Sequence, residues 1–213
     1  MAWRTLLNPL KAWFWLSVLA IGLMIGVPAW YGYQTFKTGF SAKAEPHALE
    51  VWGARQLRHL AIPLDQRNKP NPMPPSPAVL AEGRAHFADH CAVCHANDGS
   101  GQTPIGKNVY PKAPDLRQQD TQRMSDGELF FIIHNGIRFT GMPAWGSGEP
   151  DKDIDSWKLV HFIRHLPQLT AEELDEMKSL NPKTKKELEA EAAYDRFLEG
   201  TGEEPPPPAD HRH

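Results

Sequence analysis

The sequence predicts an all-α protein with an N-terminal membrane-spanning helix, a compact helical domain and a helical C-terminal extension. Three observations lead to this prediction. Residues 12–33 carry no charge, amphipathic patterns with helix-capping signals recur from Ser76 onward, and no segment shows the strict alternation of a half-buried strand. At 213 residues, the chain is long enough for one domain of about 100–150 residues with extensions.

Charge is distributed unevenly along the chain. The net charge is +5 over residues 1–77, −2 over residues 78–168 and −6 over residues 169–213, which gives −3 overall. A nucleic-acid-binding protein would carry a basic surplus, so we expect no nucleic-acid partner. The shifts in charge divide the chain into three segments of different character.

The uncharged stretch at residues 12–33 predicts a transmembrane helix, preceded by a cytoplasmic N-terminus at residues 1–11. As an α-helix it is ~33 Å long, enough to cross the hydrocarbon core of a bilayer. Aromatic residues flank it like interfacial belts: Trp13, Trp15, Trp30, Tyr31 and Tyr33. A cleaved signal peptide is the alternative, but this apolar run is longer than a usual signal sequence. We therefore expect a retained anchor.

Residues 34–76 are expected to form a juxtamembrane helix followed by a spacer. Residues 47–61 have an amphipathic pattern, and such a helix can rest on the membrane interface or on a partner subunit. Prolines then dominate the chain from Pro63 to Pro77. This composition predicts an extended, semi-rigid spacer that sets the upstream boundary of the next domain.

Residues 77–167 are expected to form the central domain, with three main helices. The first opens with Ser76 as N-cap and Pro77 at the first helical position. The second opens with an S-x-x-E capping box at Ser125 and ends at Gly136. The third begins near Asp153 or Asp155 and runs to Pro167.

The C-terminal part is expected to form a charged helical extension over residues 168–200 and a disordered tail over residues 201–213. Two further capping boxes, opened by Thr170 and Thr184, predict charged helices with thin apolar stripes. The tail contains four consecutive prolines and lacks the apolar residues of a packed segment.

The segment Cys91-Ala92-Val93-Cys94-His95 has the spacing of a covalent c-type haem attachment site. Two thiols three residues apart project to one side of a helical turn, where each can form a thioether. The adjacent imidazole can reach the iron as an axial ligand. A thioredoxin-like pair would need a βαβ context, and a zinc site would need a second close-spaced pair of ligands. The surrounding sequence shows neither.

An iron bound by His95 leaves a second axial position, for which the sequence offers several ligands. Met142 lies in a Gly-Met-Pro segment, whose backbone restrictions can present the thioether inward. Met124 is the rival, although it precedes a capping box and can pack beneath it. His134 and His161 could give two-histidine ligation, but both fall on helices whose other residues form the core.

The chain resembles a class I mono-haem cytochrome c over residues 77–167. The resemblance rests on motifs in a fixed order: Cys91-Ala92-Val93-Cys94-His95, Ala113-Pro114-Asp115-Leu116, Ser125-Asp126-Gly127-Glu128-Leu129 and Gly141-Met142-Pro143-Ala144-Trp145. It implies a cytochrome c-like haem domain within the all-α fold.

The resemblance also implies roles for individual residues. One haem c would be bound covalently through Cys91 and Cys94, with His95 and Met142 as axial ligands. The carbonyl of Pro114 would accept the proton of the His95 ring. Arg138 and Trp145 would lie near the haem propionates, and Gly83 and Phe87 would cross the closing helix at Leu159 and Phe162.

With both axial positions filled by protein, outer-sphere electron transfer is expected, and the chain itself is expected not to be an enzyme. It would act in a respiratory chain as a tethered shuttle or as a haem subunit of a membrane oxidoreductase. Expected partners are a quinol-oxidising complex, a dehydrogenase or a terminal oxidase. The expected location is the bacterial inner membrane, single-pass, with the haem domain on the periplasmic side. The alternative is a haem-based gas sensor or peroxidase-like enzyme with a labile distal ligand.

Overall fold

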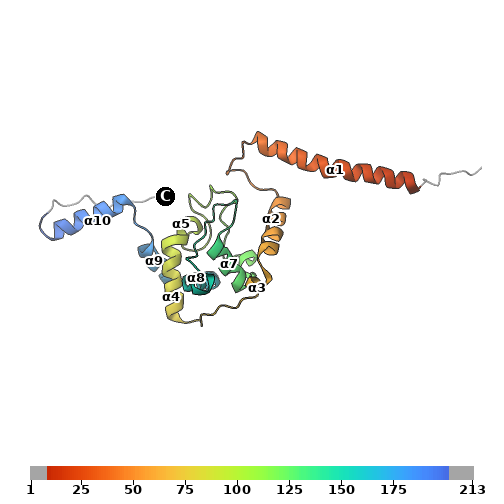
Figure 1. Ribbon diagram of the computed structural model, residues 1–213. Coiled ribbons are helices and arrows are strands. Elements are labelled where there is room, and N and C mark those ends of the chain that lie inside the picture. The colour runs from red at the N-terminus through yellow and green to blue at the C-terminus, as the bar shows by residue number, and fades with distance from the viewer. Residues whose placement is uncertain (1–8, 202–213) are drawn as a thin grey trace, which may run out of the picture. The chain divides into compact units, whose positions relative to one another are not determined.

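The computed structural model describes residues 9–201, and within that range it contains helices, turns and loops but no strand. This all-α architecture (Figure 1) confirms the predicted fold class. The chain divides into two units, residues 1–46 and residues 47–213. The first eight residues of the predicted cytoplasmic N-terminus, and the predicted tail beyond residue 201, lie outside the described residues.

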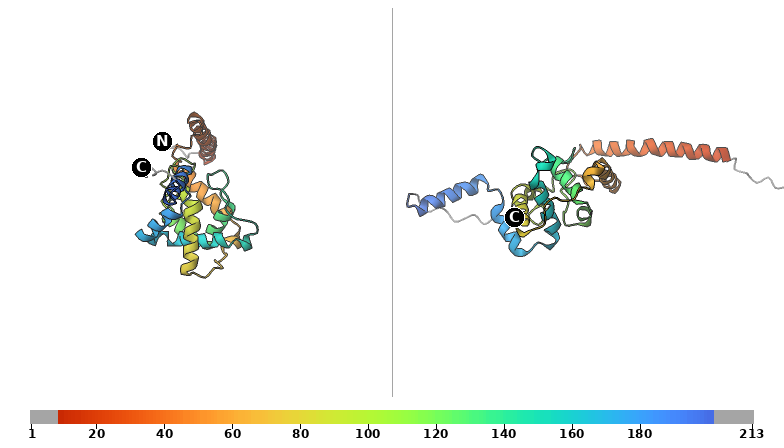
Figure 2. Two further views of the ribbon diagram at one scale, coloured as in Figure 1. Left: turned by 90° about the vertical axis from the view of Figure 1, so that its left-hand side faces the viewer. Right: turned by 60° about the horizontal axis from the view of Figure 1, so that its bottom comes forward.

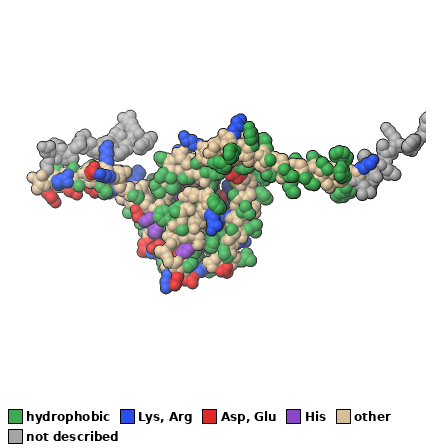
Figure 3. Space-filling view, turned by 45° about the horizontal axis from the view of Figure 1, so that its top comes forward, with side chains coloured by type: hydrophobic (Ala, Val, Ile, Leu, Met, Phe, Trp, Pro, Cys, Tyr) green, Lys and Arg blue, Asp and Glu red, His purple; other side chains and the backbone are tan. Residues whose placement is uncertain are grey.

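The first unit contains one long helix, α1 (Pro9–Lys37). It is long and apolar enough to cross a membrane, and its window of highest hydropathy has no buried residue. Figure 3 shows the apolar side chains along its surface. The helix ends four residues beyond the predicted limit of residue 33. Polar residues such as Gln34 and Thr35 continue it, because a helix need not end where the hydrocarbon core ends.

The helices of the second unit are α2 (Ala48–Ala61), α3 (Leu64–Arg67), α4 (Pro77–His86), α5 (Ala92–His95), α6 (Gln119–Gln122), α7 (Asp126–Asn135), α8 (Ile154–His165), α9 (Ala171–Leu180) and α10 (Lys185–Leu198). The predicted capping signals are present. Ser76 accepts a hydrogen bond from the Val79 amide, and capping boxes open α7, α9 and α10. Asp153, rather than Asp155, caps α8.

Helices α4 and α8 pack across each other (Figures 1 and 2), and Gly83 lies at their closest approach. A Cβ atom at this glycine would lie 2.4 Å from the Lys158 carbonyl oxygen and 3.2 Å from Phe162 Cβ. Next to the crossing, the rings of Phe87 and Phe162 lie 5.0 Å apart. The crossing therefore depends on a backbone-to-backbone approach that only glycine permits, as the resemblance implied.

The core lies between α4, α7 and α8. The Phe130 and Trp157 rings stack at 4.1 Å, and the largest side chains with almost no exposure are Trp157, Phe87, Phe130 and Phe162. Burying each of these aromatic side chains contributes on the order of 2–3 kcal/mol. This apolar cluster holds the helices that carry the motifs of the predicted site.

The proline-rich segment differs from the predicted spacer because it packs on the domain. The Asn71 side-chain amide donates to the Trp157 carbonyl at 3.1 Å, and the Met73 carbonyl lies 2.9 Å from His161 Nε2. A Cβ at Gly127 would lie 2.0 Å from the Gln66 carbonyl oxygen. Prolines keep this segment extended, but hydrogen bonds to α8 and a close approach to α7 hold it against the domain.

The first helix of the predicted extension also belongs to the domain. Met177 of α9 is fully buried, and Glu173 forms ion pairs with Arg84 at 3.0 Å and His165 at 2.9 Å. By contrast, α10 has no buried residue. Helix α9 is therefore packed on the domain.

Candidate haem-attachment site

Cys91, Cys94 and His95 lie in consecutive helical turns at the end of the first domain helix. A π-helical turn, η1 (Phe87–Cys91), follows α4 and leads directly into α5. The run ends at Ala96, whose φ of 60° turns the chain away from the helix. Both cysteines are half-buried free thiols, as thioether formation requires.

The His95 ring fits the role of an axial ligand. It is half-buried, and its Nδ1 atom is shielded from solvent. Burial lowers the pKa of His95, while a hydrogen bond to the carbonyl of Pro114 acts in the opposite direction. A neutral imidazole is the form that binds a metal. These observations fit a haem iron on one side of the ring and Pro114 on the other.

The Cys91 thiol is not in the state expected of a redox dithiol. Burial, together with the neighbouring Cys94, raises the pKa of Cys91 to about 12. A reactive pair in a thioredoxin-like site has a lowered pKa. Among residues 9–201 no group of three His, Cys, Asp or Glu side chains is placed to hold a metal ion. The pKa of Cys91 is thus shifted in the direction opposite to that of a thioredoxin-like thiol.

The loop after His95 is held to the backbone of the attachment motif by hydrogen bonds. The Gly101 amide donates to the His95 carbonyl at 2.8 Å, and Thr103 Oγ1 donates to the Cys94 carbonyl at 3.2 Å. A Cβ at Gly106 would lie 2.2 Å from that same Cys94 oxygen. The loop therefore follows the motif closely before it reaches Pro114. Thr103 was not identified from the sequence, although the glycine spacing of this segment could have indicated a tight loop.

Met142 lies in a second tight loop, which follows α7. Its amide donates to Thr140 Oγ1 at 3.1 Å, and its carbonyl accepts from the Ile137 amide at 3.1 Å. Gly136 ends α7 with a φ of 66°, and a Cβ there would lie 2.6 Å from the Ala144 amide. These contacts fix the backbone on both sides of Met142 and leave its side chain half-buried.

The Met142 loop approaches residues on both sides of the attachment motif in the sequence. The Trp145 ring meets the edge of the His90 ring, with ring centroids 5.3 Å apart. A Cβ at Gly141 would lie 2.8 Å from Val109 Cγ1 in the first loop. Segments about 50 residues apart in the sequence are thereby brought to one side of the domain. Trp145 contacts a residue adjacent to Cys91, which supports its assignment to the site.

The competing ligands are engaged elsewhere. His134 is buried, and its Nδ1 lies 2.6 Å from the Asp153 carboxylate. His161 Nε2 lies 2.9 Å from the Met73 carbonyl, and Met124 packs against the hydrophobic core. Arg138 is exposed on the Met142 loop. Of the four candidate iron ligands, Met142 is therefore the one whose side chain is least occupied by contacts within the domain.

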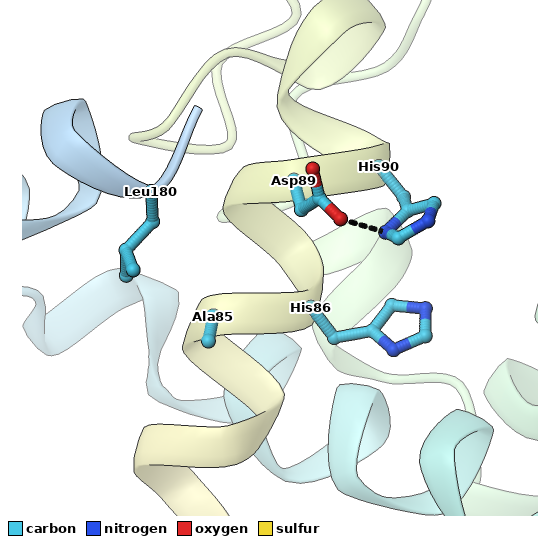
Figure 4. A pocket seen from close by; sticks show the side chains of 5 residues that line it. All are labelled: Ala85, His86, Asp89, His90 and Leu180. Carbon is cyan, nitrogen blue, oxygen red and sulfur yellow. Dashed lines mark ion pairs between the residues drawn. The ribbon is translucent and has the colours of Figure 1, made fainter. Parts of the chain in front are cut away.

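An open groove of about 360 Å³ lies along the helix that precedes Cys91, lined by Ala85, His86, Asp89, His90 and Leu180. Figure 4 shows the rings of His86 and His90 pointing to the same side of this helix. The two ring centroids are 4.6 Å apart. Burial and the neighbouring His90 lower the pKa of His86. His90 borders this groove and also contacts Trp145.

A cluster of two carboxylates and one guanidinium, formed by Asp98, Asp115 and Arg117, stabilises the loop that carries Pro114. Arg117 Nε and Nη2 each lie 2.8 Å from a different oxygen of Asp115, and Arg117 Nη1 lies 3.1 Å from Asp98. Hydrogen bonds from Arg117 hold the pKa of Asp115 well below its usual range. Sequence reasoning missed this cluster, although the Asp-Leu-Arg spacing was visible.

Replacing Asp115 by asparagine is expected to lower the free energy of unfolding by about 1 kcal/mol at pH 7, allowing for partial exposure of the pair. Because the folded-state pKa is depressed, this contribution is present above the ordinary aspartate pKa of about 4 and is lost as pH falls through the folded-state value. Urea unfolding at pH 7 and pH 3 tests this. The exposed Asp175, which pairs with Lys178, supplies the control Asp175→Asn. If Asp115→Asn lowered the free energy of unfolding equally at pH 7 and pH 3, the loss could not come from the ionised Asp115–Arg117 pair.

The helical domain, with a C-x-x-C-H motif and a loop that carries the half-buried Met142, has the features of a c-type cytochrome domain. A family model for the cbb3-type cytochrome c oxidase subunit III matches residues 78–163. The chain is 33% identical over 79 residues to a cbb3-type cytochrome c oxidase subunit CcoP of Cereibacter sphaeroides. It is 31% identical over 94 residues to a thiosulfate dehydrogenase of Stutzerimonas stutzeri. These findings confirm the resemblance to a c-type cytochrome.

The two similarities are confined to part of each protein. They cover 37% and 43% of this chain, and 25% and 29% of the respective relatives. The chain therefore spans about a quarter to three tenths of the length of the relatives it matches. The shared part supports covalently bound haem c.

Proposed function

We propose that the chain is a membrane-anchored electron carrier with one covalently bound haem, ligated by His95 and Met142. The observation that carries this proposal is the half-buried His95 ring beside the carbonyl of Pro114, directly after two half-buried cysteines three residues apart. The sequence contains one C-x-x-C-H motif and no further cysteine, which supports a single haem.

Each residue of the site would have a separate role. Cys91 and Cys94 would hold the haem through thioethers, while His95 and Met142 would occupy both axial positions. The bound haem supplies one-electron oxidation and reduction, and thioether sulfur favours ferrous iron and a raised potential. Pro114 would orient the His95 ring. With no axial position left for a substrate, the domain would pass electrons to and from other proteins.

The chain would be single-pass in the bacterial inner membrane, with the cytochrome domain on the periplasmic side. Helix α1 has the length and composition of a span, and in cytochromes of the class it resembles haem attachment takes place outside the cytoplasm. The domain would then lie where soluble and membrane-bound redox proteins meet.

Of the two possible roles, the similarities favour a subunit of a terminal oxidase-type complex over a tethered shuttle, because one relative is named as an oxidase subunit. Two features support it. Gly22 and Gly26 form a G-x-x-x-G pair on α1, and no atom lies within 4 Å of a Cβ placed at either glycine, which permits close approach of another membrane helix. The exposed α10 offers a further surface for a partner.

Extraction of native membranes in a mild detergent tests the proposal. We expect the chain to migrate with a larger oxidoreductase complex in a native gel and to retain haem in a denaturing gel. Replacing Cys91 and Cys94 by serine should abolish the retained haem, and replacing Gly22 and Gly26 by leucine should weaken the complex without affecting haem attachment. A lone haem protein would support the tethered shuttle instead. Absence of covalently bound haem in the wild type would contradict the whole proposal.

A further inference from the structure

Helix α2 has one apolar face, and that face points away from the domain. Leu49, Trp52, Leu57 and Leu60 occupy positions i, i+3, i+8 and i+11, which fall on one side of a helix. Each of the four side chains is between 62% and 71% exposed. A surface helix of a soluble domain would turn such a face toward the core.

A different face of α2 is attached to the domain, so the exposure of the apolar face is not a consequence of a loose helix. His59 Nδ1 lies 2.6 Å from Glu128 of α7, and Arg55 lies 2.7 Å from Asp120 of α6. Ile62, directly after the helix, is only 3% exposed. Arg67 also donates to the backbone carbonyls of His59 and Ile62. These contacts set the rotation of α2 about its axis and keep its apolar face outward.

We propose that this apolar face of α2 binds the lipid bilayer that α1 crosses, in the plane of the membrane interface. Only residues 38–47 separate α1 from α2, and ten residues span at most about 36 Å. The chain between them carries exposed Phe40 as well as Lys43. The first residue of α2 is thus tethered close to the membrane surface.

The composition of the face suits lipid. Trp52 is an amphipathic ring of the kind enriched at bilayer interfaces, and leucines on one side with charges on the other are typical of interfacial helices. Further exposed apolar side chains lie before α2 in the sequence, at Phe36 and Phe40, and after it, at Leu64.

Binding of α2 to lipid would restrict the orientation of the cytochrome domain. Because α2 is joined to α7 through Glu128, and α7 leads into the Met142 loop, the domain could not rotate freely on residues 38–47. One side of the domain would face the bilayer, and the remaining sides would be available to redox partners. This inference rests on α1 spanning the membrane, but not on the haem ligands or the partner.

A spin label at Leu57 tests the inference in the full chain. In the matured protein Cys91 and Cys94 are taken up by the haem, so Leu57→Cys supplies the one free thiol. Ala54→Cys is the matched control, since Ala54 is exposed on the same helix but outside the apolar face. In lipid nanodiscs, we expect the ratio of collision rates with oxygen to those with a water-soluble nickel chelate to be severalfold higher at position 57 than at position 54.

Two results would overturn the inference. Equal ratios at both positions would show that the face is in water. A label at position 57 that is shielded from both reagents in native membranes, but in water in nanodiscs, would show that a protein covers the face. Three labels per chain instead of one would reveal unattached haem, which is a failure of the proposed function and not of the lipid contact.

Discussion

Replacing Met142 by leucine is expected to lower the midpoint potential of the haem by on the order of 100 mV, a fraction of the ~0.8 V range that axial ligands span. Leucine keeps the volume of the side chain but removes the thioether, which stabilises ferrous iron. The reduced variant should then bind carbon monoxide, while the haem stays covalently attached. Redox titration and the visible absorption spectrum provide the measurement.

Met124→Leu is the matched control for this substitution, because Met124 is the rival thioether and packs against the core. It should leave both the potential and the absorption spectrum unchanged. If the Met142 variant behaved like the wild type, the distal ligand would have to be Met124 or a histidine. Rapid carbon monoxide binding by the reduced wild type at neutral pH would instead favour the gas-sensor or peroxidase-like alternative.

Replacing Gly83 by alanine is expected to lower the free energy of unfolding by about 2–3 kcal/mol, because overpacking forces helices apart. The added Cβ would lie 2.4 Å from the Lys158 carbonyl oxygen, and a backbone atom cannot move aside as a flexible side chain can. The shift would also displace Phe87, four residues before Cys91. Thermal unfolding of the haem-loaded protein measures the loss.

Gly53→Ala is the control for the Gly83 variant. Gly53 also lies inside a helix, but no atom lies within 4 Å of a Cβ placed there. Alanine at this position should leave stability unchanged or raise it by about 0.5–1 kcal/mol, because glycine is the poorer helix former. Equal effects at the two positions would show that helix propensity, and not the α4–α8 crossing, accounts for the loss.

The crossing at Gly83 links the packing of α4 and α8 to the position of the candidate site. Helix α4 leads through η1 to Cys91, and α8 is capped by Asp153, which also binds His134 near the start of the Met142 loop. A change in the angle between the two helices would therefore move Cys91 and Cys94 relative to Met142, the proposed distal ligand. The proposed geometry of the site thus depends on the close approach that Gly83 permits.

Several elements could be predicted from the sequence because their causes are local. The uncharged stretch at residues 12–33 predicted the long apolar helix. The Ser125–Glu128 capping box predicted the start of α7, since both of its hydrogen bonds lie within one turn. The C-x-x-C-H spacing likewise depends only on the geometry of a helical turn. Family similarity supports the class of protein, while the pair of axial ligands remains a prediction.

Only the tertiary structure decided where these elements pack. The prolines after α2 predicted an extended segment, but not that Asn71 would bind the Trp157 carbonyl of α8. The charged pattern of α9 predicted a helix, but not that Met177 would be buried. Amphipathicity predicted α2, yet its apolar face points outward because ion pairs to Glu128 and Asp120 hold a different face. Helix formation depends on residues within a few positions, whereas docking depends on surfaces that meet only in the folded chain.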